Sequence, residues 1–490
     1  MLQTKDGGLK LYKLFGRSSL LFLLVSLSLS GLSAKSFEDF KRSQSESFQS
    51  YIDERDESFS KYLQENWEAY NSIDPHTLYE EEKPSYIKPA RFQNLKKIGP
   101  KIDVYVKALP KTKEKKAEIT PTKEIQKEGL VFDYFGKTLE FIAPTEIYTA
   151  RYSPQTQKGV KNFLDTVVST DYEPFLKQIL KIFQELNLND WGKYLLIRKI
   201  SEKIFPSQDN SRLLAGFIFN KLGYSIRIGL AHRHVLLMFH SEKIIYSTPS
   251  YTIDNKKFYL ISNYAENNEG EVFTYKADYP QANKAFDLSM KVLPSLKKDI
   301  REKSLSFKQY GKKYDIKYKY NQNIIDFMAT YPQADYETFF NTPLEKSTYY
   351  DIATSLRKHI NGKRASVAIN FVLNFVQNSF KYEVDSQQFG REKVMFAQET
   401  LYYDKSDCED RAILFSYLVK ELFNISVVGV KYKDHMSTAL YIPMDGDSVK
   451  VKAKRFVIAD PTYINATIGQ NMPKYKTKRP KSFIYVKADK

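Results

Sequence analysis

The alternation of apolar and polar positions divides the chain into segments of different character. The first is a short apolar run from Leu20 to Leu32, which follows a Lys/Arg-rich stretch and precedes the small residue Ala34. This order is typical of a secretory signal, and the run is shorter than the roughly 18 residues expected of a membrane-spanning helix. The pattern predicts a signal peptide over 1–34 and an exported protein, periplasmic or secreted. An uncleaved signal-anchor, which would keep the protein at the membrane, is the alternative.

A repeat of aromatic residues follows the apolar run. Phe37, Phe48 and Phe59 recur at a spacing of 11, and each is followed three residues later by a second aromatic. Because about 11 residues make three helical turns, these aromatic pairs fall on one helical face. The repeat predicts an amphipathic helix over 36–71, whose aromatic face docks on a core, contacts a membrane surface or mediates self-association.

The periodic pattern then breaks down. Six prolines interrupt a Lys/Glu-rich stretch between residues 72 and 128. This composition predicts an extended, solvated linker, with one short strand at Ile102–Val106.

The remainder of the chain reads as one unit written twice. Leu213–Leu222 parallels Ile413–Leu422 at an offset of 200, and further matches before and after this pair occur in the same order. Each copy has helical apolar spacing followed by strand-like segments, which predicts an α+β fold with helices packed on an antiparallel sheet. We expect the copies at 129–275 and 305–490, joined by a polar connector at 276–304.

Composition and charge limit the classes of function. The chain has 42% hydrophobic residues with 36 Tyr and 33 Phe, which argues against wholesale disorder. Its formal charge of +17 suggests a polyanionic neighbour such as cell-envelope polymer, although Lys-rich surfaces are most often simply solvated. Because the protein is expected to be exported, we expect no nucleic-acid partner.

The chain contains a single cysteine, Cys408. A lone cysteine in an exported protein makes no intramolecular disulfide, so it is either an inert core residue or a free reactive thiol. Asp407 and Asp410 form a capping-box pattern that predicts a helix starting at Cys408. A helix N-terminus stabilises a thiolate, but the charges of Glu409 and Asp410 oppose this, so an activated thiol needs a histidine partner.

His435 and Asp460 have the positions that such chemistry requires. His435 lies within a predicted pair of strands, and Asp460 ends the strand that follows. A nucleophile, a base and a residue that orients the base, contributed by a helix tip and two neighbouring strands, form a catalytic triad in its thiol form. A turn-starting role for Asp460 before Pro461 is the alternative.

These residues resemble a known superfamily. The segments Asp407–Ala412, Glu399–Leu401 and Ile458–Thr462, together with His435, are similar to the transglutaminase-like cysteine enzymes, which have a papain-like core. The resemblance implies tandem transglutaminase-like domains, with Cys408 as nucleophile, His435 as base and Asp460 as orienting residue. The family's usual Gly before the Asp-Cys pair is Ser406 here, and Gln398 is a weak candidate for the oxyanion hole.

The first copy departs from this pattern. At the equivalent positions it has Gln208 for the cysteine and Thr248 for the aspartate, while His234 matches the histidine. The shorter interval between His234 and Thr248 is interpreted as an insertion near 444–454 in the second copy. The first copy is therefore expected to be an inactive pseudo-domain.

The sequence thus predicts an exported thiol enzyme that acts on peptide or amide bonds through a thioester. It is expected to be a cysteine peptidase or amidase, or a protein-glutamine acyltransferase, with hydrolysis favoured over transamidation. A peptide or protein of the cell envelope is the expected substrate, and no cofactor and no metal are expected. The alternative is a non-catalytic envelope scaffold, in which Cys408 is buried and unreactive.

Overall fold

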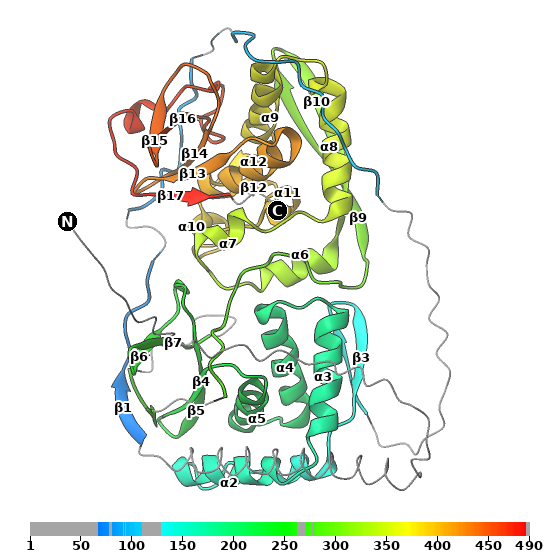
Figure 1. The fold of residues 1–490 in the computed structure, drawn as a ribbon, viewed down its shortest axis with the longest axis vertical. Coiled ribbons are helices and arrows are strands. Elements are labelled where there is room, and N and C mark those ends of the chain that lie inside the picture. The colour runs from blue at the N-terminus through cyan, green and yellow to red at the C-terminus, as the bar shows by residue number, and fades with distance from the viewer. Residues whose placement is uncertain are drawn as a thin grey trace, which may run out of the picture. The chain divides into compact units, whose positions relative to one another are not determined.

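The computed structural model describes residues 67–77, 81–109 without 92 and 94, 129–261, and 270–486 without 277, 278 and 280 (Figure 1). These residues belong to one compact unit, and their fold is α+β with mainly antiparallel sheets, as predicted. The predicted signal over 1–34 and most of the predicted helix over 36–71 lie outside the described residues. No helix within the described ranges is long and apolar enough to span a membrane.

The last residues of the predicted N-terminal helix form a strand instead. β1 (Trp67–Asn71) pairs antiparallel with β8 (Glu271–Tyr275), and Trp67 is buried with its ring 5.6 Å from that of Tyr275. The helical prediction is therefore wrong for these residues. Pairing with a strand that lies far away in sequence outweighs the local helical period.

The first half of the molecule combines a hairpin, a group of helices and a sheet. The apolar residues of its helices repeat at helical spacing and face the core, as Phe175, Ile179 and Phe183 do in α3. The sheet has the order β1-β8-β4-β5-β7-β6. The elements are β2 (Leu130–Tyr134), β3 (Lys137–Phe141), the 3-10 helix η1 (Thr145–Thr149), α2 (Gln157–Val168), α3 (Glu173–Glu185), α4 (Asp190–Ile204), α5 (Gln208–Lys221), β4 (Ile226–Ala231), β5 (His234–His240), β6 (Ser250–Ile253), β7 (Lys256–Tyr259) and β8.

The second half has a longer hairpin, more helices and a sheet of the order β15-β16-β14-β13-β17. A short parallel pair, β11 with β12, lies just before the last helix. The elements are β9 (Ile300–Gln309), β10 (Lys312–Asn321), α6 (Gln322–Ala329), α7 (Tyr336–Phe340), α8 (Lys346–Ile360), α9 (Ala365–Ser379), β11 (Lys381–Tyr382), α10 (Asp385–Gln388), α11 (Ala397–Tyr402), β12 (Lys405–Ser406), α12 (Cys408–Phe423), β13 (Val427–Lys431), β14 (Met436–Leu440), β15 (Ser448–Val451), β16 (Lys454–Ile458), the 3-10 helix η2 (Pro473–Tyr475) and β17 (Ser482–Tyr485).

The two halves share one order of elements. Each begins with a hairpin whose turn contains a Gly of positive φ, Gly136 or Gly311. In each, a last helix (α5 or α12) is followed by a hairpin, a second hairpin and a closing strand. The strands then stand in the same order, β8-β4-β5-β7-β6 in one sheet and β17-β13-β14-β16-β15 in the other. This is the arrangement expected of a duplicated unit.

The segment predicted to be a solvated linker is partly buried. Residues 81–109, which we call the strap, belong to the blue part of Figure 1. Those of them that the structure describes form no strand, so the predicted strand at 102–106 is absent. Their backbone instead forms hydrogen bonds with the loop between α8 and α9; for example, Ile102 N donates to Lys363 O at 2.8 Å. Lys83 and Val104 are buried, which corrects the prediction of a solvated spacer.

The connector at 276–304 also differs from its prediction. Phe286, Leu288 and Met290 are buried in the core, and β9 begins inside the connector at Ile300. The connector is therefore not polar throughout, because several of its apolar side chains belong to the core.

The sheet of the second half contains one position where only glycine fits. A Cβ atom on Gly429 in β13 would lie 2.8 Å from the ring of Phe340 in α7 and 3.2 Å from Ile484 in β17. The helix and the neighbouring strand therefore approach this backbone too closely for a side chain.

We predict that Gly429→Ala lowers the free energy of unfolding by about 1–3 kcal/mol, because overpacking displaces Phe340. Urea denaturation followed by circular dichroism measures this. Gly129→Ala is the matched control, since the added Cβ would meet only the flexible side chain of Glu140. Equal stabilities of the two variants would contradict the packing described for β13.

Candidate catalytic site

Cys408 is the first residue of α12, as its sequence context predicts. The Asp410 carboxylate accepts from Asp407 N at 3.3 Å, which is one of the two hydrogen bonds of a capping box. The predicted start of a helix at Cys408 is thus confirmed. It places the sulfur at a helix N-terminus, where backbone N–H groups have no intrahelical partner.

His435 and Asp460 lie at neighbouring strand ends and meet. His435 immediately precedes β14, Asp460 follows β16, and the two strands are paired. His435 Nε2 is 2.8 Å from Asp460 Oδ2, while Asp460 Oδ1 accepts from Thr462 N at 2.9 Å. Asp460 therefore both starts a turn and fixes the imidazole, so the two alternative roles coexist.

The sulfur of Cys408 reaches the same place. Met436 N, the amide that follows His435, donates to Cys408 Sγ at 3.4 Å. The side chains of Cys408, His435 and Asp460 are all 0% exposed. The structure thus brings the three residues of the predicted triad together in the interior.

The second imidazole nitrogen, His435 Nδ1, is buried and has no hydrogen-bond partner among the described residues. The ring itself is held by stacking on Tyr475, with centroids 4.8 Å apart and an interplanar angle of 19°. An unsatisfied buried nitrogen is costly, and a catalytic role is one of the explanations for such an exception.

The thiol bonds to a carboxylate in this structure. Cys408 Sγ donates to Glu409 Oε2 at 3.1 Å, and within the described residues no hydrogen bond joins the sulfur to the imidazole. Burial, followed by the charges of Glu409 and Asp407, raises the pKa of the Cys408 thiol well above its usual value, whereas Lys83 lowers it. The thiol is therefore protonated in this arrangement.

Lys83, from the strap, is a residue of the site that the sequence analysis missed. Its Nζ lies 2.6 Å from Asp407 Oδ2 and also contacts Glu409. It is further paired with Glu392 at 2.6 Å and with Asp385 at 3.4 Å. A lysine in Pro-rich, Lys-rich sequence carries no signal that distinguishes it from its solvated neighbours, so the sequence alone could not have identified it.

The carboxyl groups of Asp385, Glu392, Asp407 and Glu409 form an acidic cluster around the Lys83 ammonium. The pKa values in this cluster are set by burial and by the charge of the ammonium. Burial lowers the pKa of Lys83, but the charges of Asp407, Glu409 and Asp385 outweigh this and raise it well above its usual value. Burial raises the pKa of Asp385 to about 6 and that of Glu392 to about 7. Burial also acts to raise the pKa of Glu409, but Lys83 outweighs it and lowers this pKa to about 2.

Within the described part of the chain, three sets of groups in this region could hold a metal ion. They are Asp407, Cys408 and Glu409; Asp385, Glu392 and Glu409; and Asp385, Asp407 and Asp410. In this structure the Lys83 ammonium supplies the positive charge next to them.

Two further buried residues support the site. Gln377, on α9, donates from Nε2 to Asp460 O at 3.0 Å and to Tyr463 O at 2.9 Å, which holds the loop after β16. Arg411 donates from Nε to Ser406 Oγ at 3.0 Å and is otherwise bonded to backbone carbonyls. Ser406 thus fixes the segment before Cys408 through its hydrogen bond with Arg411.

Gln398 has no role at the thiol. Its Oε1 accepts from Glu345 N at 3.1 Å, and its Nε2 donates to Thr348 Oγ1 at 3.2 Å. Both ends of the amide are therefore engaged near the start of α8, and the prediction of an oxyanion-hole side chain is not met.

Two of the predicted first-copy counterparts have equivalent places. Gln208 is the first residue of α5, the position that Cys408 has in α12. His234 lies beside the turn of its hairpin, as His435 does, but its side chain is 69% exposed and its Nδ1 is 3.3 Å from Asp209.

Thr248 is not equivalent to Asp460. It precedes the β6–β7 hairpin, whereas Asp460 follows the corresponding β15–β16 hairpin, so the equivalent place is at Leu260–Ile261. The segments around Thr248 and Asp460 are similar in sequence but occupy different places in the two halves, so the predicted equivalence is wrong. The insertion inferred near 444–454 is wrong for the same reason, since a hairpin occupies this interval in both halves.

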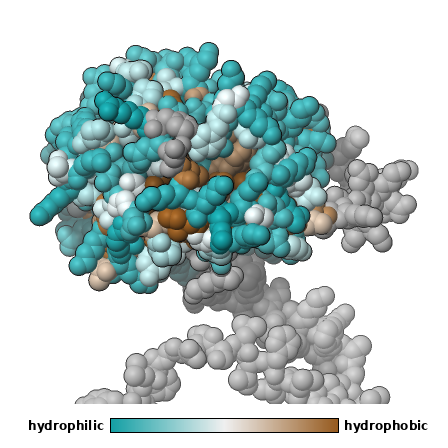
Figure 2. Space-filling view, turned by 90° about the horizontal axis from the view of Figure 1, so that it is seen from above, coloured by the Kyte–Doolittle hydropathy of each residue, from teal (hydrophilic) through white to brown (hydrophobic). Residues whose placement is uncertain are grey.

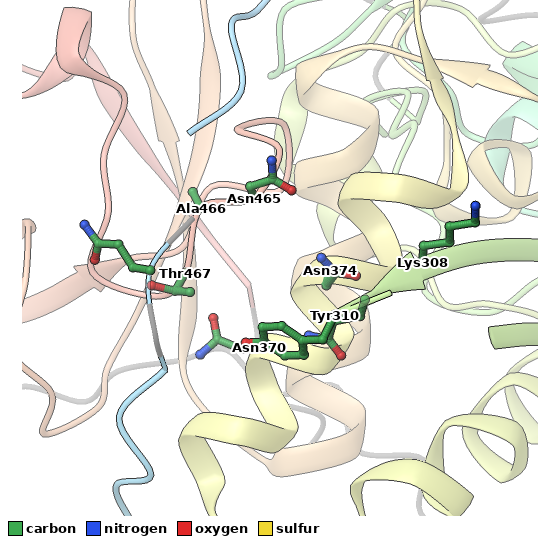
Figure 3. Close-up of a pocket in the computed structure, with 9 residues that line it drawn as sticks. Lys308, Tyr310, Asn370, Asn374, Asn465, Ala466 and Thr467 are labelled. Atoms are coloured by element: carbon green, nitrogen blue, oxygen red, sulfur yellow. The ribbon is translucent and has the colours of Figure 1, made fainter. Parts of the chain in front are cut away.

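A small recess of about 50 Å³ lies between the hairpin residues 308–310, α9 and the segment 465–467 that follows β16 (Figure 3). Its walls include amides from α9 and the loop residues Asn465 and Thr467, and Cys408, His435 and Asp460 do not line it. The recess therefore does not open onto the thiol. The face seen in Figure 2 is mainly hydrophilic, with a small hydrophobic area near its middle.

No protein-family model, no curated protein and no solved structure matches this chain. The residues of the site are therefore the basis for any assignment of function.

The acidic cluster predicts a pH dependence of stability. Because the pKa values of Asp385 and Glu392 are raised, these carboxyls keep protons in the folded protein at pH values where the unfolded chain has released them. Their contribution to the free energy of unfolding should fall as the pH rises from about 4 to about 7. Asp385→Asn and Glu392→Gln should weaken this fall in thermal unfolding between pH 5 and pH 7.5. Glu302→Gln, at an exposed carboxylate, is the control, and equal pH profiles of all variants would contradict the interpretation.

Proposed function

We propose that this protein is an exported thiol enzyme that acts on peptide or amide bonds through Cys408, His435 and Asp460. In this proposal the two halves are transglutaminase-like domains, of which the first is a pseudo-domain. The observation that carries the proposal is the state of the imidazole. Its Nε2 is fixed by Asp460, while its buried Nδ1 has no partner among the described residues. The backbone amide of the next residue, Met436, donates to the only thiol of the chain.

This arrangement supports a stepwise acyl transfer. The thiol leaves Glu409 and transfers its proton to His435 Nδ1, and the sulfur attacks the carbonyl carbon of the substrate. The imidazolium, stabilised by Asp460, then protonates the leaving amine, and a thioester remains on Cys408. Water adds to the thioester with His435 as base, which releases the carboxylic acid and restores the thiol. Hydrolysis is favoured over transfer to an amine.

Backbone groups are the better candidates for stabilising the oxyanion, since Gln398 is engaged elsewhere. The N–H of Cys408 lies in the first turn of α12, where such groups lack intrahelical acceptors. It is therefore the donor that we assign to the developing oxyanion.

The first half supports a role other than catalysis. Gln208 stands at the position of the nucleophile, and the imidazole of His234 is exposed to solvent. We infer that this half contributes packing or substrate docking rather than a second centre.

A non-catalytic scaffold is favoured by one observation, the complete burial of Cys408 with a raised thiol pKa. In that case the acidic cluster and the histidine only stabilise the fold. Reactivity of the thiol separates the two functions.

We predict that iodoacetamide alkylation of native Cys408, which proceeds through a transient opening in which the thiol exchanges Glu409 for His435, has an apparent thiol pKa below the reference of about 8.5, because the imidazole accepts the proton. His435→Ala should remove this low-pH reactivity, and Asp460→Asn should reduce labelling at pH 6 to about one tenth or less, the effect of one pKa unit. His234→Ala is the matched control and should label like the wild type. Labelling that occurs only after unfolding, or that is indifferent to His435, would support the scaffold.

A further inference from the structure

The strap contacts the loops of all three residues of the candidate triad. Glu81 pairs with Lys433, two residues before His435. Lys83 pairs with Asp407 and with Glu409, on either side of Cys408. Ala90 N donates to Ile464 O at 2.8 Å, four residues after Asp460. Between these contacts Ile87 packs on the apolar cluster that includes Tyr432 and Tyr475, beside His435.

The strap is also the element of this region that is best able to move. Cys408 and His435 are fully buried, so a substrate carbonyl reaches the sulfur only after something is displaced. α12 and the paired strands beneath it are hydrogen-bonded elements with apolar cores, whereas residues 81–91 contain neither helix nor strand. Segments with few backbone hydrogen bonds open at the lowest free-energy cost.

We propose that residues 81–91 fill the substrate groove as an intramolecular pseudosubstrate, and that the acidic pocket around Lys83 is the subsite for a cationic side chain of the substrate. This inference rests on the proposed function and names the class of its substrate: an extended peptide that carries a lysine or arginine next to the bond that is attacked.

The burial pattern of residues 81–91 resembles that of a bound peptide. This segment has no helix or strand and bends at Ser85; Lys83 is buried, Ile87 is half-buried, and Tyr86 between them is 72% exposed. Its side chains thus divide between the protein and solvent, as in a peptide bound along a groove.

The charge of the pocket requires a cation. Four carboxylates, those of Asp385, Glu392, Asp407 and Glu409, surround the Lys83 ammonium, and three of these side chains are almost completely buried. Removal of the ammonium without replacement would leave buried carboxylates unpaired, which is strongly unfavourable. A peptide that displaces the strap therefore binds best when it supplies a positive charge itself, because the buried carboxyl groups would otherwise have to take up protons.

The first test loosens the strap without changing Lys83, because a Lys83 substitution would itself disturb the buried carboxylates. In the double variant Glu81→Lys, Ile87→Asp, one substitution opposes Lys433 with a like charge and the other removes an apolar contact. We expect alkylation of Cys408 to be at least tenfold faster than in the wild type, and unchanged in the control Tyr86→Ala. An unaccelerated rate in a double variant whose thermal unfolding remains cooperative would overturn the proposal.

The second test supplies the strap sequence as a separate peptide. A synthetic peptide with the sequence of Glu81–Arg91 should slow alkylation of the double variant, whereas the same peptide with Lys83→Ala should not. Equal protection by both peptides, or protection by neither, would overturn the cationic subsite.

Adding His435→Ala to the double variant separates the two proposals. Fast labelling that loses its low-pH component supports both. Fast labelling that is indifferent to His435 means that the strap covers an ordinary thiol, which overturns the proposed function and the subsite with it. Labelling that depends on His435 but is not accelerated in the double variant supports the function and overturns the strap as a pseudosubstrate.

Discussion

The candidate site depends on one buried charge interaction, that of the Lys83 ammonium with the carboxylates at the start of α12. Asp407 and Glu409 flank the thiol, and without a cation their charges would oppose both burial and ionisation of the sulfur. The ion pairs are close, and the surroundings exclude water, so the interaction is little screened by salt. Because the lysine comes from a segment far away in sequence, the same contact holds the strap against the start of α12.

The same local arrangement occurs in both halves of the molecule. A helix that starts beside a hairpin places its first residue next to the strand ends; this residue is Gln208 in the first half and Cys408 in the second. In the second half a carboxylate at the next strand end and a stacked tyrosine fix the imidazole. The chemistry therefore depends on a few residues at loop ends, while the duplicated framework of helices and sheets holds them.

Much of the site was predictable because its signals are local. The capping pattern of Asp407 and Asp410 fixes the helix start, and the strand pattern around His435 and Asp460 places both at strand ends. The rest depends on contacts between distant segments. Lys83 looks like any solvated lysine, and Trp67 follows a helical repeat but pairs with a strand some two hundred residues later.

The error at Thr248 has a different physical origin. Short sequences around a proline resemble one another, so the similarity of the segments around Thr248 and Asp460 did not distinguish the loop before a hairpin from the end of a hairpin. Sheet order, which sets the true equivalence, is a property of long-range pairing. The correct equivalences between the two halves come from the helices and from the hairpin turns at Gly136 and Gly311, where the backbone needs a positive φ.

The central claim, that Cys408 is a nucleophile served by His435 and reached by lysine-bearing peptides, is tested most directly by intact-mass measurement. The protein is incubated with an extended peptide that carries a lysine and an electrophilic carbon in place of the scissile carbonyl. The account predicts a single covalent adduct on Cys408 that forms with the wild type and is lost in His435→Ala. An unmodified wild-type mass, in a sample whose thiol is fully alkylated by iodoacetamide after unfolding, would contradict it.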